Sequence, residues 1–164
     1  MSVHNVPAFD LLTGQKSPYL GFGIPIAESE RRIETFLGLA GLARARIQKT
    51  FGSRLEDTGQ LPREIDDIIA GMWKDGWKPE GNNVNLFVTD FGAVVADALL
   101  HVCEGKLVFR SDTDISHLSI WWPNSGVELF PFHALLKILL HPQENTVQSL
   151  FKGALSYSEK SGKR

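Results

Sequence analysis

"KLVFRSDTDISHLSIWWPNSGVELFPF", residues 106–132, decides the fold that the sequence predicts. It contains three short runs rich in β-branched and aromatic residues, and these runs cover residues 106–110, 117–122 and 127–130. The turn formers "SDTD" and "PNSG" separate them, and both tetrapeptides are typical of tight connections. The stretch therefore predicts a three-stranded antiparallel β-meander that leads directly into a helix.

Helices are predicted on both sides of this meander, because apolar residues recur there at steps of three and four. Each such run places its apolar side chains on one helical face. The expected helices cover residues 29–51, 62–74, 85–102, 131–141 and 147–154. Helices followed by a small sheet and then by more helices indicate an α+β fold, in which one layer of helices packs on the sheet.

The length of 164 residues fits one domain with a sizeable core. We expect this single domain over residues 1–155. Residues 1–26 are rich in proline and glycine, which predicts an irregular arm instead of a helix. Residues 156–164 are polar and predict a flexible tail.

Composition limits the partners and the compartment. The chain has 17 basic and 19 acidic residues and no basic block, which argues against a nucleic-acid partner. No apolar run approaches the length needed to span a bilayer, and no export signal is recognisable, so we expect no membrane association. Cys103 is the single cysteine and is expected to be a small buried residue, which suits a reducing cytoplasm.

The strand over residues 117–122 has two faces of different character. Alternation places Leu118, Ile120 and Trp122 on one face, which we assign to the core because it is the more apolar. His117, Ser119 and Trp121 share the other face. An aromatic side chain beside small polar residues is typical of a protein-binding surface, whereas coverage by the N-terminal arm is an equally open alternative.

Three residues within the meander are candidates for chemistry. Asp112, Asp114 and His117 have a D-x-D-x-x-H spacing, which could offer two oxygens and one nitrogen to a metal ion. The same spacing could supply a general base with its orienting carboxylates. The competing interpretation is a turn, because aspartates in turns commonly accept hydrogen bonds from backbone N–H groups two residues further on. We favour the turn.

Other polar and aromatic residues receive structural interpretations. Asp90 and Asp97 share a helical face and are expected to form a solvated stripe. The arginines of the first helix, among them Arg44 and Arg46, are likewise expected on a solvated face. Trp77 follows the second helix and is expected to pack back over the end of that helix, although it remains a candidate for partner binding.

Residues 91–140 resemble a bacterial family known as domain of unknown function 3806. The resemblance rests on a glycine-containing helix, a short tryptophan-bearing strand and a "GVELFP" junction between strand and helix over residues 126–131. It implies a small fold of helices and a β-meander, and some genomically neighbouring families look like immunity or adaptor proteins. It implies no catalytic residues.

The sequence favours a non-enzymatic bacterial protein that binds a protein partner, of an immunity or adaptor type, without a cofactor or a bound metal. We expect the partner to contact Trp77, Asp112, Asp114, His117 and Trp121. The alternative is a small metal-dependent hydrolase that uses Asp112, Asp114 and His117. A small-molecule pocket beneath the N-terminal arm also stays open.

Overall fold

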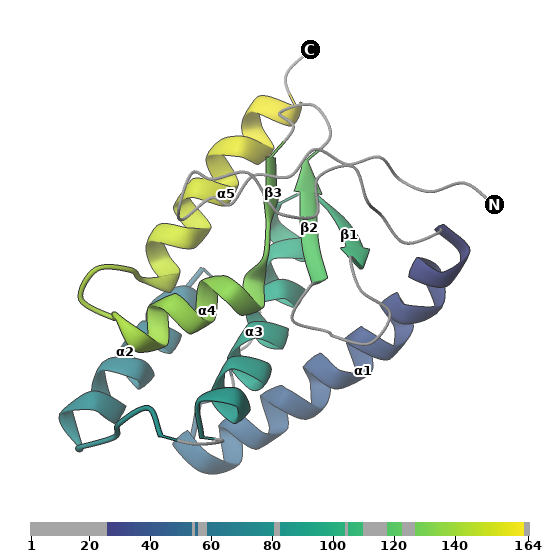
Figure 1. The fold of residues 1–164 in the computed structure, drawn as a ribbon. Coiled ribbons are helices and arrows are strands. Elements are labelled where there is room, and N and C mark those ends of the chain that lie inside the picture. Colours follow the sequence, from purple (N-terminus) through teal and green to yellow (C-terminus); the bar gives the residue numbers. More distant parts are fainter. Residues whose placement is uncertain are drawn as a thin grey trace.

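The computed structural model describes residues 26–53, 55, 59–80, 83–103, 105–109, 118–122 and 127–162. Within these ranges it contains five helices and one antiparallel sheet of three strands (Figure 1). The elements in chain order are α1 (Ile26–Phe51), α2 (Leu61–Lys74), α3 (Asn83–Val102), β1 (Lys106–Phe109), β2 (Leu118–Trp122), β3 (Val127–Leu129), α4 (Pro131–Leu140) and α5 (Val147–Gly162). The predicted α+β fold is confirmed.

The sheet has the predicted meander order β1-β2-β3. Trp121 of β2 lies opposite Lys106 of β1 and Glu128 of β3, and both strand pairs are antiparallel. The side chains of Leu118, Ile120 and Trp122 are fully buried, which confirms the face assigned to the core. Alternation along β2 therefore assigned its core-facing residues correctly from sequence.

Helix α3 lies at the centre of the fold, between α1 and α4 (Figure 1). All of its residues from Phe91 to Leu99 are buried. Among the described residues, α3 is the one helix long and apolar enough to cross a membrane, with a mean hydropathy of 1.4 over its best window, so the expectation that no apolar run approaches that length is wrong. Half of that window is buried within the fold, so the position of α3 in the core accounts for its apolar composition.

Gly92 permits the close contact between α3 and α4. A Cβ atom at this position would lie 2.5 Å from Cδ1 of Phe132, whose side chain is buried in the core. Real Cβ atoms essentially never come so close to another carbon, so glycine is required for this packing.

Several sequence expectations on extent and burial are wrong. Helix α5 continues to Gly162, whereas the sequence predicted its end near residue 154. Leu37 and Val102 share the apolar spacing of their helices, but they are 45% and 47% exposed. Periodicity identifies a helical face, yet it does not say how far the neighbouring elements extend over that face. The predicted arm lies outside the described residues except for Ile26.

Candidate binding surface

A groove with a volume of about 440 Å³ runs between α2, α3 and α5. Its volume is within the range of ligand-binding pockets, about 300–1,000 Å³. Most of its lining is apolar. The residues that line it are Gly59, Gln60, Pro62, Arg63, Ala98, Val102, Gln148, Phe151, Lys152 and Leu155.

Apolar side chains at two depths form this groove. Ala98 of α3 and Phe151 of α5 are buried and belong to the hydrophobic core. Val102 and Leu155 lie further out and are 47% and 41% exposed. The core thus continues outward into an apolar surface that no other described part of the chain covers completely. Exposed apolar patches next to polar residues often mark interaction sites.

Arg63 and Lys152 give the groove a positive charge. Both line it, and both residues are exposed. Among the described residues that line the groove, none is acidic. The groove therefore combines apolar surface with two cations.

Asp66 fixes the position of α5 relative to α2. Its carboxylate accepts hydrogen bonds from the backbone N–H groups of Val147 and Gln148, at 2.7 and 3.0 Å, and from the Gln148 side-chain amide at 3.0 Å. These N–H groups belong to the first turn of α5, where a carboxylate satisfies unpaired donors and complements the helix dipole. An acidic residue on α2 thereby holds one wall of the groove against the other.

Trp77 packs inside an aromatic cluster, as the sequence predicts. Its ring makes edge-to-face contacts with Trp73 and Phe87, and both pairs of ring centroids are 5.6 Å apart. Phe87 in turn stacks on Phe91 at 6.0 Å. These contacts connect the last turn of α2 to the first turns of α3. Trp77 remains half-buried. Its predicted contact with a partner stays a prediction.

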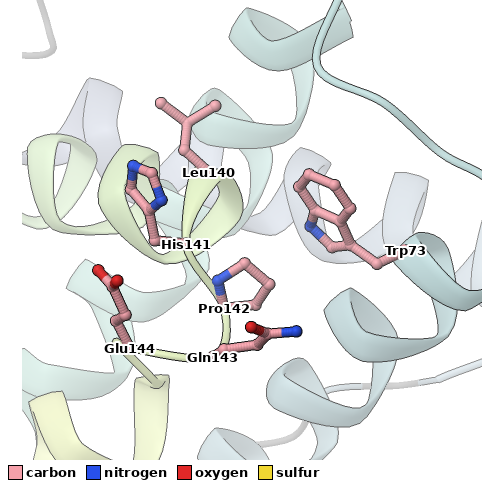
Figure 2. Close-up of a pocket in the computed structure, with 6 residues that line it drawn as sticks. All are labelled: Trp73, Leu140, His141, Pro142, Gln143 and Glu144. Atoms are coloured by element: carbon pink, nitrogen blue, oxygen red, sulfur yellow. The ribbon is translucent and has the colours of Figure 1, made fainter.

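A smaller cavity of about 230 Å³ lies where α2 meets the turn after α4 (Figure 2). Trp73 stands on one side, and the turn from His141 to Glu144 forms the other. The indole N–H of Trp73 donates a hydrogen bond to the carbonyl oxygen of Leu139 at 2.9 Å, so the polar atom of this ring is already used. The cavity is about half the volume of the groove and less suited to a partner.

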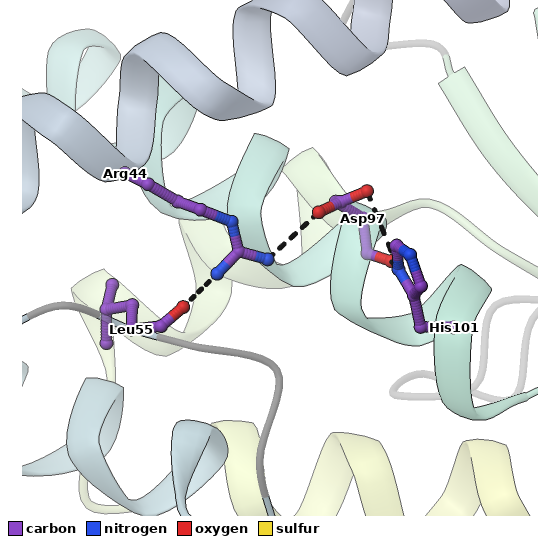
Figure 3. Close-up of polar contacts among 4 residues, drawn as sticks. All are labelled: Arg44, Leu55, Asp97 and His101. Carbon is purple, nitrogen blue, oxygen red and sulfur yellow. Dashed lines mark hydrogen bonds and ion pairs between the residues drawn. The ribbon is translucent and has the colours of Figure 1, made fainter.

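Arg44 is not on a solvated face, and Asp90 and Asp97 are not a solvated stripe, whereas Arg46 is exposed as predicted. Arg44 donates a hydrogen bond to Asp97 at 2.9 Å and another to the carbonyl oxygen of Leu55 (Figure 3). Arg46 contacts Asp90 at 2.6 Å, and this hydrogen bond raises the pKa of the guanidinium. Sequence spacing along one helix could not reveal these pairs, because each joins two different helices.

His101 lies beside Asp97. Its Nδ1 atom is 2.8 Å from the carbonyl oxygen of Asp97 and 3.7 Å from Oδ1 of Asp97 (Figure 3). The imidazole is 58% exposed, whereas Asp97 is 11% exposed and paired with Arg44. The Asp97 carboxylate thus joins α1 to α3, and its role is structural.

The face of β2 opposite the core is partly closed. Ser119 is buried, and its hydroxyl donates a hydrogen bond to the buried carboxylate of Glu128. Trp121 is half-buried, and the ammonium group of Lys106 lies 5.8 Å from its ring centroid. Ser119 is therefore inaccessible to a partner, and the predicted role of Trp121 in partner binding stays a prediction.

Asp112, Asp114 and His117 lie outside the described residues. Their proposed metal site and their proposed role in partner binding both stay predictions. In the parts of the chain that the structure describes, no three His, Cys, Asp or Glu residues are grouped closely enough to hold a metal ion. Cys103 is fully buried, and burial raises the pKa of its thiol to about 11, so the expectation of a buried residue is confirmed.

Sequence reasoning missed the groove. Its clearest signal was the pattern of α5, in which Gln148, Phe151, Lys152 and Leu155 follow one another at steps of three, one and three. A glutamine and a lysine beside Phe151 and Leu155 are unusual for a face that packs wholly against the core. Comparison with protein-family models, with curated proteins and with solved structures finds no match to this chain.

Proposed function

We propose that this chain is a non-enzymatic protein-interaction domain, of an adaptor or immunity type, that binds a segment of a protein partner in the groove between α2, α3 and α5. The observation that carries the proposal is the outward continuation of the core, with Val102 and Leu155 both more than 40% exposed. Partner binding commonly uses such apolar surface with polar residues at its rim.

Two further observations support a binding role. Arg44, Arg46 and Asp97 all have partners within the fold, and both ion pairs join α1 to α3. These charged residues therefore contribute to the structure of the domain. Arg63 and Lys152, in contrast, line an open surface.

We also propose that the protein acts in the cytoplasm, since a buried thiol such as Cys103 is compatible with a reducing compartment.

The proposal is tested by blocking the groove. Leu155→Glu introduces a charge at its rim and should abolish partner capture, because an apolar partner side chain packed there would have to desolvate the new carboxylate. Leu86→Glu is the matched control: Leu86 is 67% exposed and lies near the opposite end of α3 from Val102. Both substitutions add the same charge at an exposed leucine.

The immobilised full-length protein and both variants are incubated with lysate of the source organism, and bound proteins are quantified by mass spectrometry. A partner should be recovered with the wild type and with Leu86→Glu, and lost with Leu155→Glu. Circular dichroism establishes that both variants are folded. Equal recovery with Leu155→Glu and wild type would exclude the groove as the binding surface.

A further inference from the structure

Helix faces form two walls of the groove. Gln148, Phe151, Lys152 and Leu155 form one face of α5, and Ala98 and Val102 form one face of α3. The stripe on α5 spans about two helical turns, or about 10 Å. An amphipathic helix that docks in such a groove presents apolar anchors at steps of three or four residues.

Helical walls also exclude another common mode of peptide recognition. Addition of a peptide strand requires an exposed sheet edge with unpaired N–H and C=O groups. The residues that line the groove belong to α2, α3, α5 and the turn before α2, and none of them lies in a strand. A helical partner, which satisfies its own backbone hydrogen bonds, fits this surface.

The positive charge of the groove favours a partner with acidic side chains. Arg44 and Arg46 pair with carboxylates at 2.9 and 2.6 Å. Arg63 and Lys152 make no ion pair with any residue in the described ranges. Two cations beside an apolar groove, with no acidic residue in its described lining, are complementary to carboxylates on the partner.

We propose that the occupant of the groove is an acidic amphipathic helix of a partner protein. Its apolar face packs on Phe151, Val102 and Leu155, and carboxylates at the border of that face pair with Arg63 and Lys152. This inference rests on the proposed function and adds the class of partner.

Three synthetic peptides of about 18 residues test the inference, a length at which isolated helices become appreciably populated. The first carries leucines on one helical face with glutamates beside them. The second has lysines in place of those glutamates. The third has the composition of the first in an order that disperses the leucines. Fluorescence anisotropy with the full-length protein measures the dissociation constants.

The acidic amphipathic peptide should bind about tenfold more tightly than the lysine peptide, because two attractive pairs become repulsive ones in the latter. It should also bind more tightly than the dispersed peptide, and Leu155→Glu should abolish its binding. The double variant Arg63→Glu/Lys152→Glu should reverse the preference between the glutamate and lysine peptides.

A second double variant, Lys49→Glu/Lys78→Glu, controls for net charge. Both lysines are exposed, neither lines the groove, and the change in total charge is the same. This control should retain the preference for the acidic peptide. Reversal in the control would show a long-range effect of net charge and would overturn the inference.

The remaining outcomes separate the inference from the proposed function. Equal binding of the two amphipathic peptides, abolished by Leu155→Glu, would overturn the acidic partner but leave the groove as a docking surface. If Leu155→Glu loses partner capture but no peptide binds the wild type, the helical occupant is overturned and the groove remains the docking surface. Equal capture in Leu155→Glu and wild type overturns the proposed function itself.

Two other occupants are also distinguishable. Sedimentation with vesicles of equal parts phosphatidylglycerol and phosphatidylcholine, lost in Arg63→Glu/Lys152→Glu, would identify an anionic membrane surface and overturn the inference. Sedimentation equilibrium that shows a dimer, dissociated by Leu155→Glu, would identify a second copy of the chain and would also overturn it. We expect neither vesicle binding nor a groove-dependent dimer.

Discussion

Gly92 shows how one residue sets the approach of two helices. The ring of Phe132 occupies the space that a Cβ atom would need, and Phe132 is itself buried. Glycine in a helix interior ordinarily lowers helix stability by about 1 kcal/mol relative to alanine. At this position the packing of α4 on α3 outweighs that loss, because a larger side chain would separate the two helices.

Gly92→Ala is therefore expected to lower the free energy of unfolding by about 1–3 kcal/mol, the usual cost of overpacking a core. Gly41→Ala is the matched control, since Gly41 lies in α1, is exposed and has open space where a Cβ atom would lie. It should leave stability unchanged or raise it by up to about 1 kcal/mol. Urea denaturation measures both values, and stabilisation by Gly92→Ala would contradict the argument.

Cys103 is a second residue whose role follows from burial. Its thiol is inaccessible, and its pKa is raised to about 11 because the thiolate would lose its hydration in the core. The sequence predicted this role correctly, since the cysteine lies at the end of an apolar helix. A thiol of this kind is a small apolar side chain and not a nucleophile.

At the scale of elements, two ion pairs connect α1 to α3. Arg44 pairs with Asp97, and the side chains are only 19% and 11% exposed. Arg46 pairs with Asp90, and the arginine is 54% exposed. Removal of one partner leaves an uncompensated charge, and the energetic cost increases with burial. The two pairs therefore allow a buried and an exposed ion pair to be compared within one helix interface.

Asp97→Asn should lower the free energy of unfolding by about 1–3 kcal/mol, because the Arg44 guanidinium loses a charged partner in a partly buried position. Asp90→Asn should cost less than about 1 kcal/mol, since water solvates Arg46. Both substitutions preserve side-chain size. Thermal and urea unfolding measure the difference, and equal losses in the two variants would show that burial does not determine the strength of these pairs.

At the scale of the whole molecule, one core joins all five helices to the sheet. The buried cluster contains residues of α1, such as Phe36, of α5, such as Leu150, and of β2, such as Trp122. Because no element has a separate core among the described residues, the domain should lose its helices and its sheet together.

Equilibrium unfolding should therefore give one transition with the same midpoint by two probes. Far-ultraviolet circular dichroism follows the helices, and tryptophan fluorescence follows both the cluster of Trp73 and Trp77 and the buried Trp122 of the sheet. Two separate midpoints would show that the helices and the sheet unfold as independent units.

Sequence by itself determined the elements and the buried face of the sheet. The period of two along residues 118–122 and the steps of three and four in the helices are local properties of the chain, so they are readable without a structure. The start of a helix at Pro131 was likewise interpretable, because the fixed φ of proline suits the first turn of a helix.

Only the tertiary structure decided which charged residues are paired and where apolar surface remains open. Arg44 and Asp97 are 53 positions apart, and Arg46 and Asp90 are 44 apart, so their contacts depend on how α1 crosses α3. Val102 and Leu155 carry the apolar spacing of core residues but line the open groove beside the start of α2. Periodicity is set within one element, whereas pairing and exposure are set between elements, and for that reason the groove became visible only in the folded chain.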